Sequence, residues 1–409
     1  MDELSVRDPH PADPQDTQFF LPQGRGCPRQ VPAGHARLRG FSPLGRVTWH
    51  DGRPVWAVTG PGLARELLTD ARLSCERTWP GFAAPGGQFA AAGARGVPLV
   101  CVEGAECEAR CRLLSPLFTA RRAALMRPRI LRIVDQLLDS MERQGPPAEL
   151  ASTFALPVSS RVICTVLGVP EIDHEFFEER TERLLSGQSV QEAALARAEL
   201  EKYLGELTGH RRRVAGEGLL GDLMRPDTPS GPLSREELTA LAGMLWAGHE
   251  TTAGMISRGV FTLLRHPEQL AAVRAGETTM DAVVGELLGH RPVPDGLLRV
   301  AVEDIEVAGH TIRAGEGVLF MTAVIDRDGS GFAQPAPLDR DGFVGRHLAF
   351  GFGARPCPGQ DLARVQLEIA LGRLFERLPG LRLAGRAKEI RSRPAALRVE
   401  GLLELPVGW

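Results

Sequence analysis

A segment near the middle of the chain predicts a helix of about thirty residues, and this length is the strongest constraint on how the sequence can fold. Apolar residues recur at helical spacing through PLSREELTALAGMLWAGHETTAGMISRGVFTLLRHP. Ser234 and Glu237 form a capping box at its start, and His266-Pro267 ends it. At ~1.5 Å per residue the helix is about 45 Å long, which is long enough to cross a domain of this size.

Small and polar residues, AGHETT from Ala247 to Thr252, interrupt the apolar pattern in the middle of this helix. A glycine there costs ~1 kcal/mol, and a buried carboxylate costs more. Small residues let another group approach the backbone, and a threonine can bond its own i−4 carbonyl and open the helix locally. The alternative is an exposed polar patch, but the flanking residues Met244, Met255 and Ile256 are apolar and favour a buried site.

A second segment, FGFGARPCPG from Phe350 to Gly359, presents a single cysteine in a rigid loop. Helical spacing follows from Gly359 to Leu378, so Cys357 precedes a helix N-terminus, where free N–H groups and the helix dipole favour the thiolate. Such a thiolate is a nucleophile or a metal ligand. No histidine base is indicated nearby, and the small residues allow a flat cofactor to lie against the loop. An inert, buried cysteine in a turn is the remaining alternative.

Composition and charge argue against a nucleic-acid-binding or membrane-spanning protein. The net charge is −3, and no apolar run approaches the ~18 residues of a transmembrane helix. The N-terminal sequence MDELSVRDPHPADPQDTQ is acidic and lacks the pattern of a signal peptide. Seven cysteines without paired C-x-x-C spacing fit a reducing compartment. We therefore expect a soluble, cytoplasmic protein.

The rest of the chain reads as one mainly helical domain with a smaller β region. An Asp51-Gly52 pair predicts a hairpin, helical periodicity then dominates to about Arg291, and strands follow from Val300. Ala308-Gly309 and Ala314-Gly315 are the turn signals of that second β region. We expect residues 1–18 to be a disordered lead and residues 19–409 to form a single domain.

The segment FGFGARPCPG resembles the haem-binding loop of the cytochrome P450 family, F-G-x-G-x-[HR]-x-C-x-G, at every fixed position. The resemblance implies the cytochrome P450 fold, with haem b between the long central helix and the cysteine loop. It makes Cys357 the proximal thiolate ligand of the iron, which favours O–O cleavage. Arg355 corresponds to a haem propionate donor, and the remaining residues implied at the cofactor are Phe350, Gly351, Gly353, Gly359 and Ala247.

The segment AGHETT is similar to the oxygen-activation segment of the same family, [AG]-G-x-[DE]-T-[TS]. Gly248 then leaves room for dioxygen, while the Thr251 hydroxyl and the Glu250 acid deliver the two protons that cleavage of the O–O bond requires. Arg299 corresponds to a second propionate donor. The resemblance covers roughly residues 40–405 and looks closest to actinobacterial members.

The resemblance implies a monooxygenase that oxidises a small organic molecule, as a tailoring step in natural-product biosynthesis. Its partners would be a ferredoxin and a ferredoxin reductase carrying electrons from NAD(P)H, because no flavin or iron–sulfur domain is indicated. We expect a monomer that binds neither nucleic acid nor membrane. Hydroxylation is the default outcome, and oxidative coupling uses the same iron. The residues implied at the substrate, each of which ordinary core packing would also explain, are Trp79, Phe82, Phe89, Leu245, Trp246, His249, Pro294, Asp295, Leu297 and Leu397.

Three segments depart from the family pattern. The E-x-x-R motif begins at Glu286 but ends at Gly289, so its arginine is missing, and we expect Arg340, Arg346 or, less favoured, Arg291 to contact Glu286 instead. Cys107 and Cys111 stand where propionate donors are usual, and A-N-R-D-P becomes IDRDG at residues 325–329. A non-catalytic, haem-poor relative that assists another enzyme is therefore the alternative function. The intact Cys357, Glu250 and Thr251 favour the enzyme.

Overall fold

The structure is a computed structural model in which the contacts divide the chain into two units. It describes residues 19–20, 43–49, 51–76, 79–83, 118–186, 190–209, 235–290, 293, 296–326, 347–353, 356–385, 390, 402 and 404–409. The first unit comprises residues 1–90, 265–357 and 386–403, and the second comprises residues 91–264, 358–385 and 404–409. The expected disordered lead lies outside the described residues, and the single domain stays a prediction.

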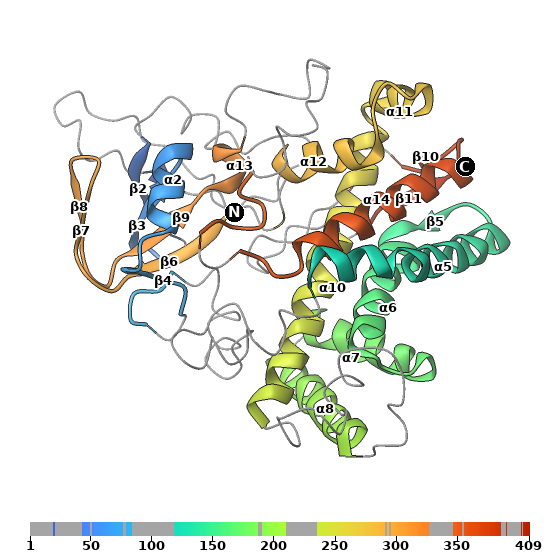
Figure 1. Cartoon of the computed structure of the whole chain (residues 1–409), viewed down its shortest axis with the longest axis horizontal. Helices are drawn as coiled ribbons and strands as arrows, with labels where there is room; N and C mark the ends of the chain where they lie inside the picture. Colours follow the sequence, from blue (N-terminus) through green and yellow to red (C-terminus); the bar gives the residue numbers. More distant parts are fainter. Residues whose placement is uncertain are drawn as a thin grey trace. The chain divides into compact units, whose positions relative to one another are not determined.

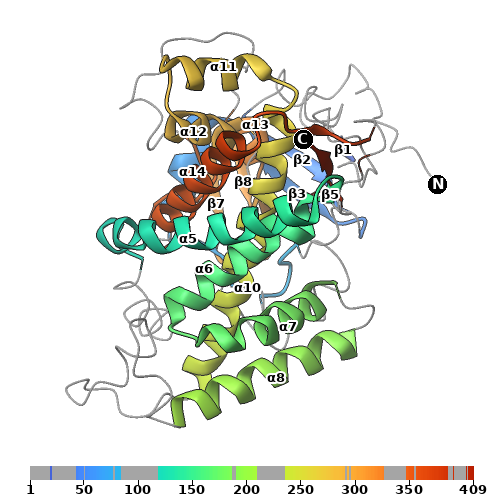
Figure 2. The same cartoon turned by 90° about the vertical axis from the view of Figure 1, so that its right-hand side faces the viewer.

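The second unit is helical, and its longest described helix is α10 (Arg235–Leu263). Figure 2 shows α10 running beside α6, with α7 and α8 toward one of its ends. The remaining elements of this unit are α5 (Ala120–Gln144), β5 (Ala148–Glu149), η3 (Ala151–Ala155), α6 (Leu156–Leu167), η4 (Glu171–Asp173), α7 (His174–Ser186), α8 (Val190–Gly209), α14 (Gln360–Arg377), β10 (Arg382–Leu383) and β11 (Pro406–Gly408).

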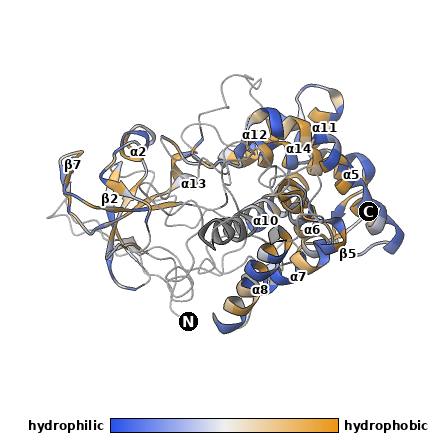
Figure 3. Ribbon diagram, turned by 60° about the horizontal axis from the view of Figure 1, so that its bottom comes forward, coloured by the Kyte–Doolittle hydropathy of each residue, from blue (hydrophilic) through white to orange (hydrophobic). Residues whose placement is uncertain are grey.

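Helix α14, which follows the cysteine loop, lies against α5 in the second unit (Figure 1). The helices bury apolar faces and turn polar faces outward, as the colouring of α5 illustrates (Figure 3). Ion pairs cross the outer edge of this contact: Arg127 binds Glu368 at 2.7 Å, and Arg373 binds Asp135 at 2.9 Å. These pairs are partly exposed, so each contributes ~1 kcal/mol or less. Apolar burial therefore determines where α14 lies.

The first unit contains a six-stranded sheet in the order β1-β2-β3-β9-β6-β4. Strands β2 and β3 are antiparallel, β3 and β9 are parallel, and β9 and β6 are antiparallel. The elements of this unit are β1 (Phe19–Phe20), β2 (Leu44–Thr48), β3 (Pro54–Val58), α2 (Pro61–Leu68), β4 (Leu73–Ser74), α11 (Pro267–Ala275), α12 (Met280–His290), β6 (Leu297–Ala301), β7 (Ile305–Val307), β8 (His310–Ile312), β9 (Gly317–Phe320) and α13 (Thr322–Ile325).

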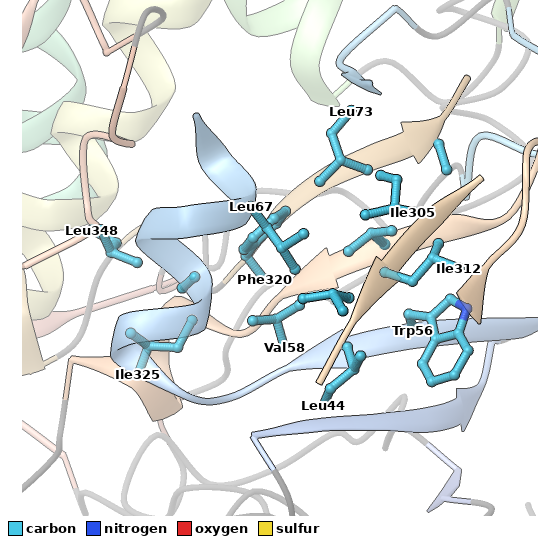
Figure 4. Packing of buried hydrophobic residues seen from close by; sticks show 14 residues of the cluster. Leu44, Trp56, Val58, Leu67, Leu73, Ile305, Ile312, Phe320, Ile325 and Leu348 are labelled. Carbon is cyan, nitrogen blue, oxygen red and sulfur yellow. The ribbon is translucent and has the colours of Figure 1, made fainter. Parts of the chain in front are cut away.

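A hydrophobic cluster joins this sheet to α2, to α13 and to the start of the cysteine loop (Figure 4). Val58 and Phe320 are fully buried at its centre. Ile325 at the end of α13 and Leu348 at the start of the loop belong to the same cluster, with 3% and 1% of their surface exposed. Apolar burial therefore fixes the loop on the sheet side at residue 348.

The described elements confirm most of the local sequence predictions. Asp51-Gly52 turns the β2–β3 hairpin, with Gly52 at φ +84°. Helix α10 ends at Leu263, shortly before His266-Pro267, as expected. Ala308 and Gly309 both have positive φ and close the β7–β8 hairpin. None of the described helices is both long and apolar enough to cross a membrane.

Candidate functional site

The cysteine loop is held by hydrogen bonds between its own backbone groups. The Cys357 N–H donates to the Phe350 carbonyl at 2.7 Å, and the Gly351 N–H donates to the Leu348 carbonyl at 2.9 Å. Cys357 is half-buried. Its thiol is thus neither sealed in the core nor fully in water, which disfavours the inert, buried cysteine that the sequence alone left open.

Glycine is required at Gly353, where the loop meets the C-terminal end of α2. Gly353 has φ +82°, and a Cβ there would lie 2.8 Å from the Leu68 carbonyl oxygen and 3.1 Å from Thr69 Cγ2. Backbone contact this close leaves no space for a side chain. Gly351 also has positive φ, at +79°. The two glycines therefore fold the loop back on itself and seat it on α2.

The polar segment of α10 is buried in the helical unit. His249, Glu250 and Thr252 are 3%, 6% and 6% exposed, so the exposed polar patch that the sequence left open is wrong. Thr251 is half-buried beside them. A buried acid next to a hydroxyl on one helix turn is a pair able to accept and pass on protons.

Gly248 has a structural reason to lack a side chain. A Cβ at this position would lie 3.0 Å from Cδ1 of Ile163 on α6, so the glycine lets α6 approach α10 closely. The expected role of Gly248 in leaving room for dioxygen stays a prediction. Close helix packing alone already accounts for the glycine.

Several other predicted site residues lie in the first unit. Arg299 is half-buried on β6, and its guanidinium donates to the Leu298 carbonyl at 2.8 Å. Phe82 packs in the sheet core and Leu297 packs against it, whereas Trp79 is 44% exposed. Core packing thus accounts for Phe82 and Leu297, and their role at a substrate stays a prediction.

The remaining predicted residues are described incompletely or not at all. Ala247, Leu245 and Trp246 are placed on α10 by their backbone only. Gly359 is the N-cap residue of α14. The residues that lie outside the described part of the chain are Arg355, Phe89, Pro294, Asp295, Leu397, Cys107 and Cys111.

Glu286 on α12 is a half-buried carboxyl. Its Oε2 atom is buried and has no hydrogen-bond partner among the described residues. Burial raises the pKa of the Glu286 carboxyl above its ordinary value. The three arginines expected to replace the missing motif arginine, Arg291, Arg340 and Arg346, lie outside the described residues.

Comparison with known proteins identifies the family. A family model described as Cytochrome P450 matches residues 278–383. The chain is 55% identical to Cytochrome P450-SOY of Streptomyces griseus over 98% of this chain and 97% of that protein. The chain belongs to the cytochrome P450 family. It is also 54% identical to pentalenic acid synthase of Streptomyces avermitilis, over 95% of this chain and 97% of that protein.

Solved structures agree with this cytochrome P450 assignment. The crystal structure of cytochrome P450 MoxA from Nonomuraea recticatena matches with a TM-score of 0.86 and 38% identity, covering 96% of this chain and 98% of that one. The predicted mainly helical cytochrome P450 fold is therefore confirmed. The protein is a cytochrome P450 monooxygenase, an oxidoreductase of a family that uses haem on a cysteine thiolate, O2 and electrons from NAD(P)H.

The residues of this cytochrome P450 fit a haem. The loop presents a half-buried sulfur in a segment of glycines and prolines. Because Gly353 has no side chain, the loop can lie directly against the end of α2. Thiolate sulfur is a suitable ligand for haem iron.

Sequence reasoning missed one residue that holds the loop. Asp326, directly after α13, accepts a hydrogen bond from the Leu348 N–H through Oδ1 at 2.8 Å. The two residues are 22 positions apart, and no local pattern signals a bond across that distance. In the sequence, Asp326 is marked by its position as an acid directly after the apolar residues of α13.

Gly353→Ala should loosen the cysteine loop. A Cβ at Gly353 would meet the Leu68 carbonyl, whereas a Cβ at Gly309, which has a similar φ of +77°, would meet no atom within 4 Å. Both substitutions carry the left-handed penalty of roughly 1–2 kcal/mol. Overlap should make Gly353→Ala roughly 1–3 kcal/mol worse than Gly309→Ala. Urea unfolding of both variants measures this difference, and equal losses of stability would contradict it.

We expect Glu286 to be tied to an arginine outside the described residues. Double-mutant cycles that combine Glu286→Gln with Arg340→Gln, Arg346→Gln or Arg291→Gln should give a coupling free energy of about 1.5–3 kcal/mol for one arginine, because a charge-assisted hydrogen bond is lost. Arg340 and Arg346 are favoured over Arg291. Zero coupling in all three cycles would show that α12 has no such tie.

Proposed function

We propose that Cys357 is the haem ligand of this cytochrome P450 and that Glu250 and Thr251 deliver protons during oxygen activation. The observation that carries the first assignment is the geometry of the loop: a half-buried cysteine, its N–H bonded to the Phe350 carbonyl, in a backbone that only glycine at residue 353 permits. The bound haem supplies the iron at which dioxygen is reduced. Phe350, Gly351, Gly353, Gly359 and Ala247 would pack near it, and Arg299 and Arg355 would bind its propionates.

The chain's own contribution to catalysis lies on α10. Burial keeps bulk water away from the Glu250 carboxyl, which is 6% exposed, so protons have to pass through groups of the protein. Thr251, the next residue, carries a hydroxyl that can accept a proton from one side while it donates one to the other. Glu250 would thus serve as the acid, and the Thr251 hydroxyl would pass the proton on toward the cofactor.

The substrate is a small organic molecule, and the reaction is a tailoring step in natural-product biosynthesis. Pentalenic acid synthase, at 54% identity, is named for such a product. Hydroxylation is the default reaction. The electrons come from NAD(P)H through a ferredoxin reductase and a ferredoxin, and the enzyme acts as a monomer in the cytoplasm. Titrating the enzyme with natural-product scaffolds while recording the Soret band would identify the ligand class.

Cys357→Ser tests the ligand assignment. The reduced carbon monoxide complex of the wild type should show the red-shifted band of thiolate ligation, and the serine variant should lose it because an alcohol oxygen is a harder and weaker donor. Circular dichroism should show that the variant stays folded. Cys164→Ser is the control, because Cys164 is fully buried in α6, away from solvent, and should leave the band unchanged.

Thr251→Ala tests proton delivery, and the neighbouring Thr252→Ala is its matched control. Both changes remove one hydroxyl from the same turn of α10. In Thr251→Ala the second proton should arrive too late, so product per NAD(P)H should fall at least several-fold while hydrogen peroxide rises. Thr252→Ala should stay coupled. Coupling unchanged in Thr251→Ala would assign proton delivery to another hydroxyl or to water.

A further inference from the structure

Asp326 connects two segments of the first unit that are distant in sequence. It lies directly after α13, where its N–H donates to the Thr322 carbonyl at 2.9 Å. Its Oδ1 accepts the Leu348 N–H at 2.8 Å. Leu348 is itself 1% exposed. Without the carboxyl, the N–H of a buried residue would lose its acceptor, which is costly.

Two backbone hydrogen bonds fold the segment between Leu348 and Cys357. The Leu348 carbonyl accepts the Gly351 N–H, and the Phe350 carbonyl accepts the Cys357 N–H. The Leu348 side chain belongs to the same buried cluster as Ile325 and residues of α2 (Figure 4). By binding the Leu348 N–H, the Asp326 carboxyl therefore fixes the start of the segment that carries Cys357.

The surroundings of Asp326 disfavour its charged form. Its Oδ2 atom is buried and has no hydrogen-bond partner among the residues that the structure describes. Burial raises the pKa of the Asp326 carboxyl to about 7, although the Leu348 N–H and the charge of Arg65 act in the opposite direction.

Two other groups beside this contact carry or can carry charge. Arg65 comes from α2 and stacks its guanidinium over the Phe352 ring, 5.8 Å from the centroid. His347 precedes Leu348, and its ring lies 5.9 Å from that of Phe350. Any pH effect at the loop has to be separated from titration of His347.

We propose that Asp326 is a positioning residue for Cys357: its buried carboxyl, when neutral, keeps residues 347–353 against α2, and ionisation favours their release because the charged carboxylate has to reach water. This inference rests on the proposed role of Cys357 as haem ligand. The hydrogen bond between Asp326 and Leu348 makes the order of the cysteine loop depend on a proton on Asp326.

The sign of the effect follows from linkage. An aspartate in water has a pKa near 4, so an opened loop releases the proton that the closed loop retains up to about pH 7. The contribution of the neutral carboxyl to the closed loop is therefore fully present below about pH 4. As pH rises toward 7, the equilibrium constant for loop closing falls by at most about tenfold per pH unit. Above pH 7 the effect levels off.

Hydrogen exchange of the holoenzyme between pH 5 and 8 tests the proposal. Protection factors, corrected for intrinsic exchange, are measured at the Leu348, Gly351 and Cys357 amides, with the β2–β3 hairpin of the same unit as internal control. Wild-type protection at the loop should fall by up to about tenfold per pH unit up to pH 7, while the hairpin stays constant. In Asp326→Asn, which keeps an oxygen acceptor but cannot ionise, loop protection should not change with pH.

Two further results would decide against the proposal. If Asp326→Asn keeps the wild-type pH dependence, Asp326 is not the titrating group. If hairpin and loop protection fall together, the proton is linked to unfolding of the whole unit. Asp326→Ala should lower Leu348 protection at every pH, and if that variant does not fold, the comparison of wild type with Asp326→Asn still decides.

The thiolate band separates this inference from the proposed function. In the wild type, the fraction of reduced carbon monoxide complex with the thiolate band should decline as loop protection declines, and in Asp326→Asn it should stay constant. Absence of the thiolate band at every pH would refute Cys357 as ligand, whereas the exchange result would still stand. A thiolate band like that expected for the wild type, without pH-dependent protection of the loop, would refute the positioning role of Asp326 and leave Cys357 as the ligand.

Discussion

The cysteine loop lies where it does because two stretches of backbone touch without a side chain between them. Gly353 meets the carbonyl of Leu68 at the end of α2, at a distance that no Cβ would fit. Apolar burial of Leu348 fixes the loop a few residues earlier, and the Cys357 N–H is bonded back to Phe350. The position of the sulfur thus depends on α2 and the sheet core. Residues far from Cys357 in the sequence therefore hold the loop that carries it.

The polar segment of α10 obeys a different constraint. Glutamate is seldom buried, yet Glu250 is only 6% exposed, and taking a carboxyl out of water costs free energy. Gly248, by contrast, is explained by its contact with Ile163. The Glu-Thr pair therefore carries the functional signal in this helix, and the glycine by itself does not. The Glu-Thr pair is therefore the feature that favours a catalytic monooxygenase over a non-catalytic, haem-poor relative.

Local patterns in the sequence predicted the elements that local physics determines. The length of α10, the Asp51-Gly52 turn and the helix after Cys357 follow from periodicity, capping and turn chemistry. The same patterns were silent about Gly353 meeting Leu68 and about Asp326 accepting from Leu348, because both contacts join segments far apart in the chain. The sequence also did not decide whether the polar segment of α10 is buried or exposed, because that depends on which other helices pack against it.

Asp326 and Glu286 show how one unit can tolerate carboxyls that burial disfavours. Each has a buried oxygen without a hydrogen-bond partner among the described residues, and burial raises the pKa of both. For Glu286 on α12, desolvation by burial is the cause of the raised pKa. Asp326 already has the Leu348 N–H and the nearby charge of Arg65, yet its pKa still rises to about 7. The Leu348 N–H and the charge of Arg65 together thus do not outweigh desolvation. An amide would satisfy the same N–H at no cost in charge, so an acid at this position adds a dependence on protons that the anchoring of the loop does not require.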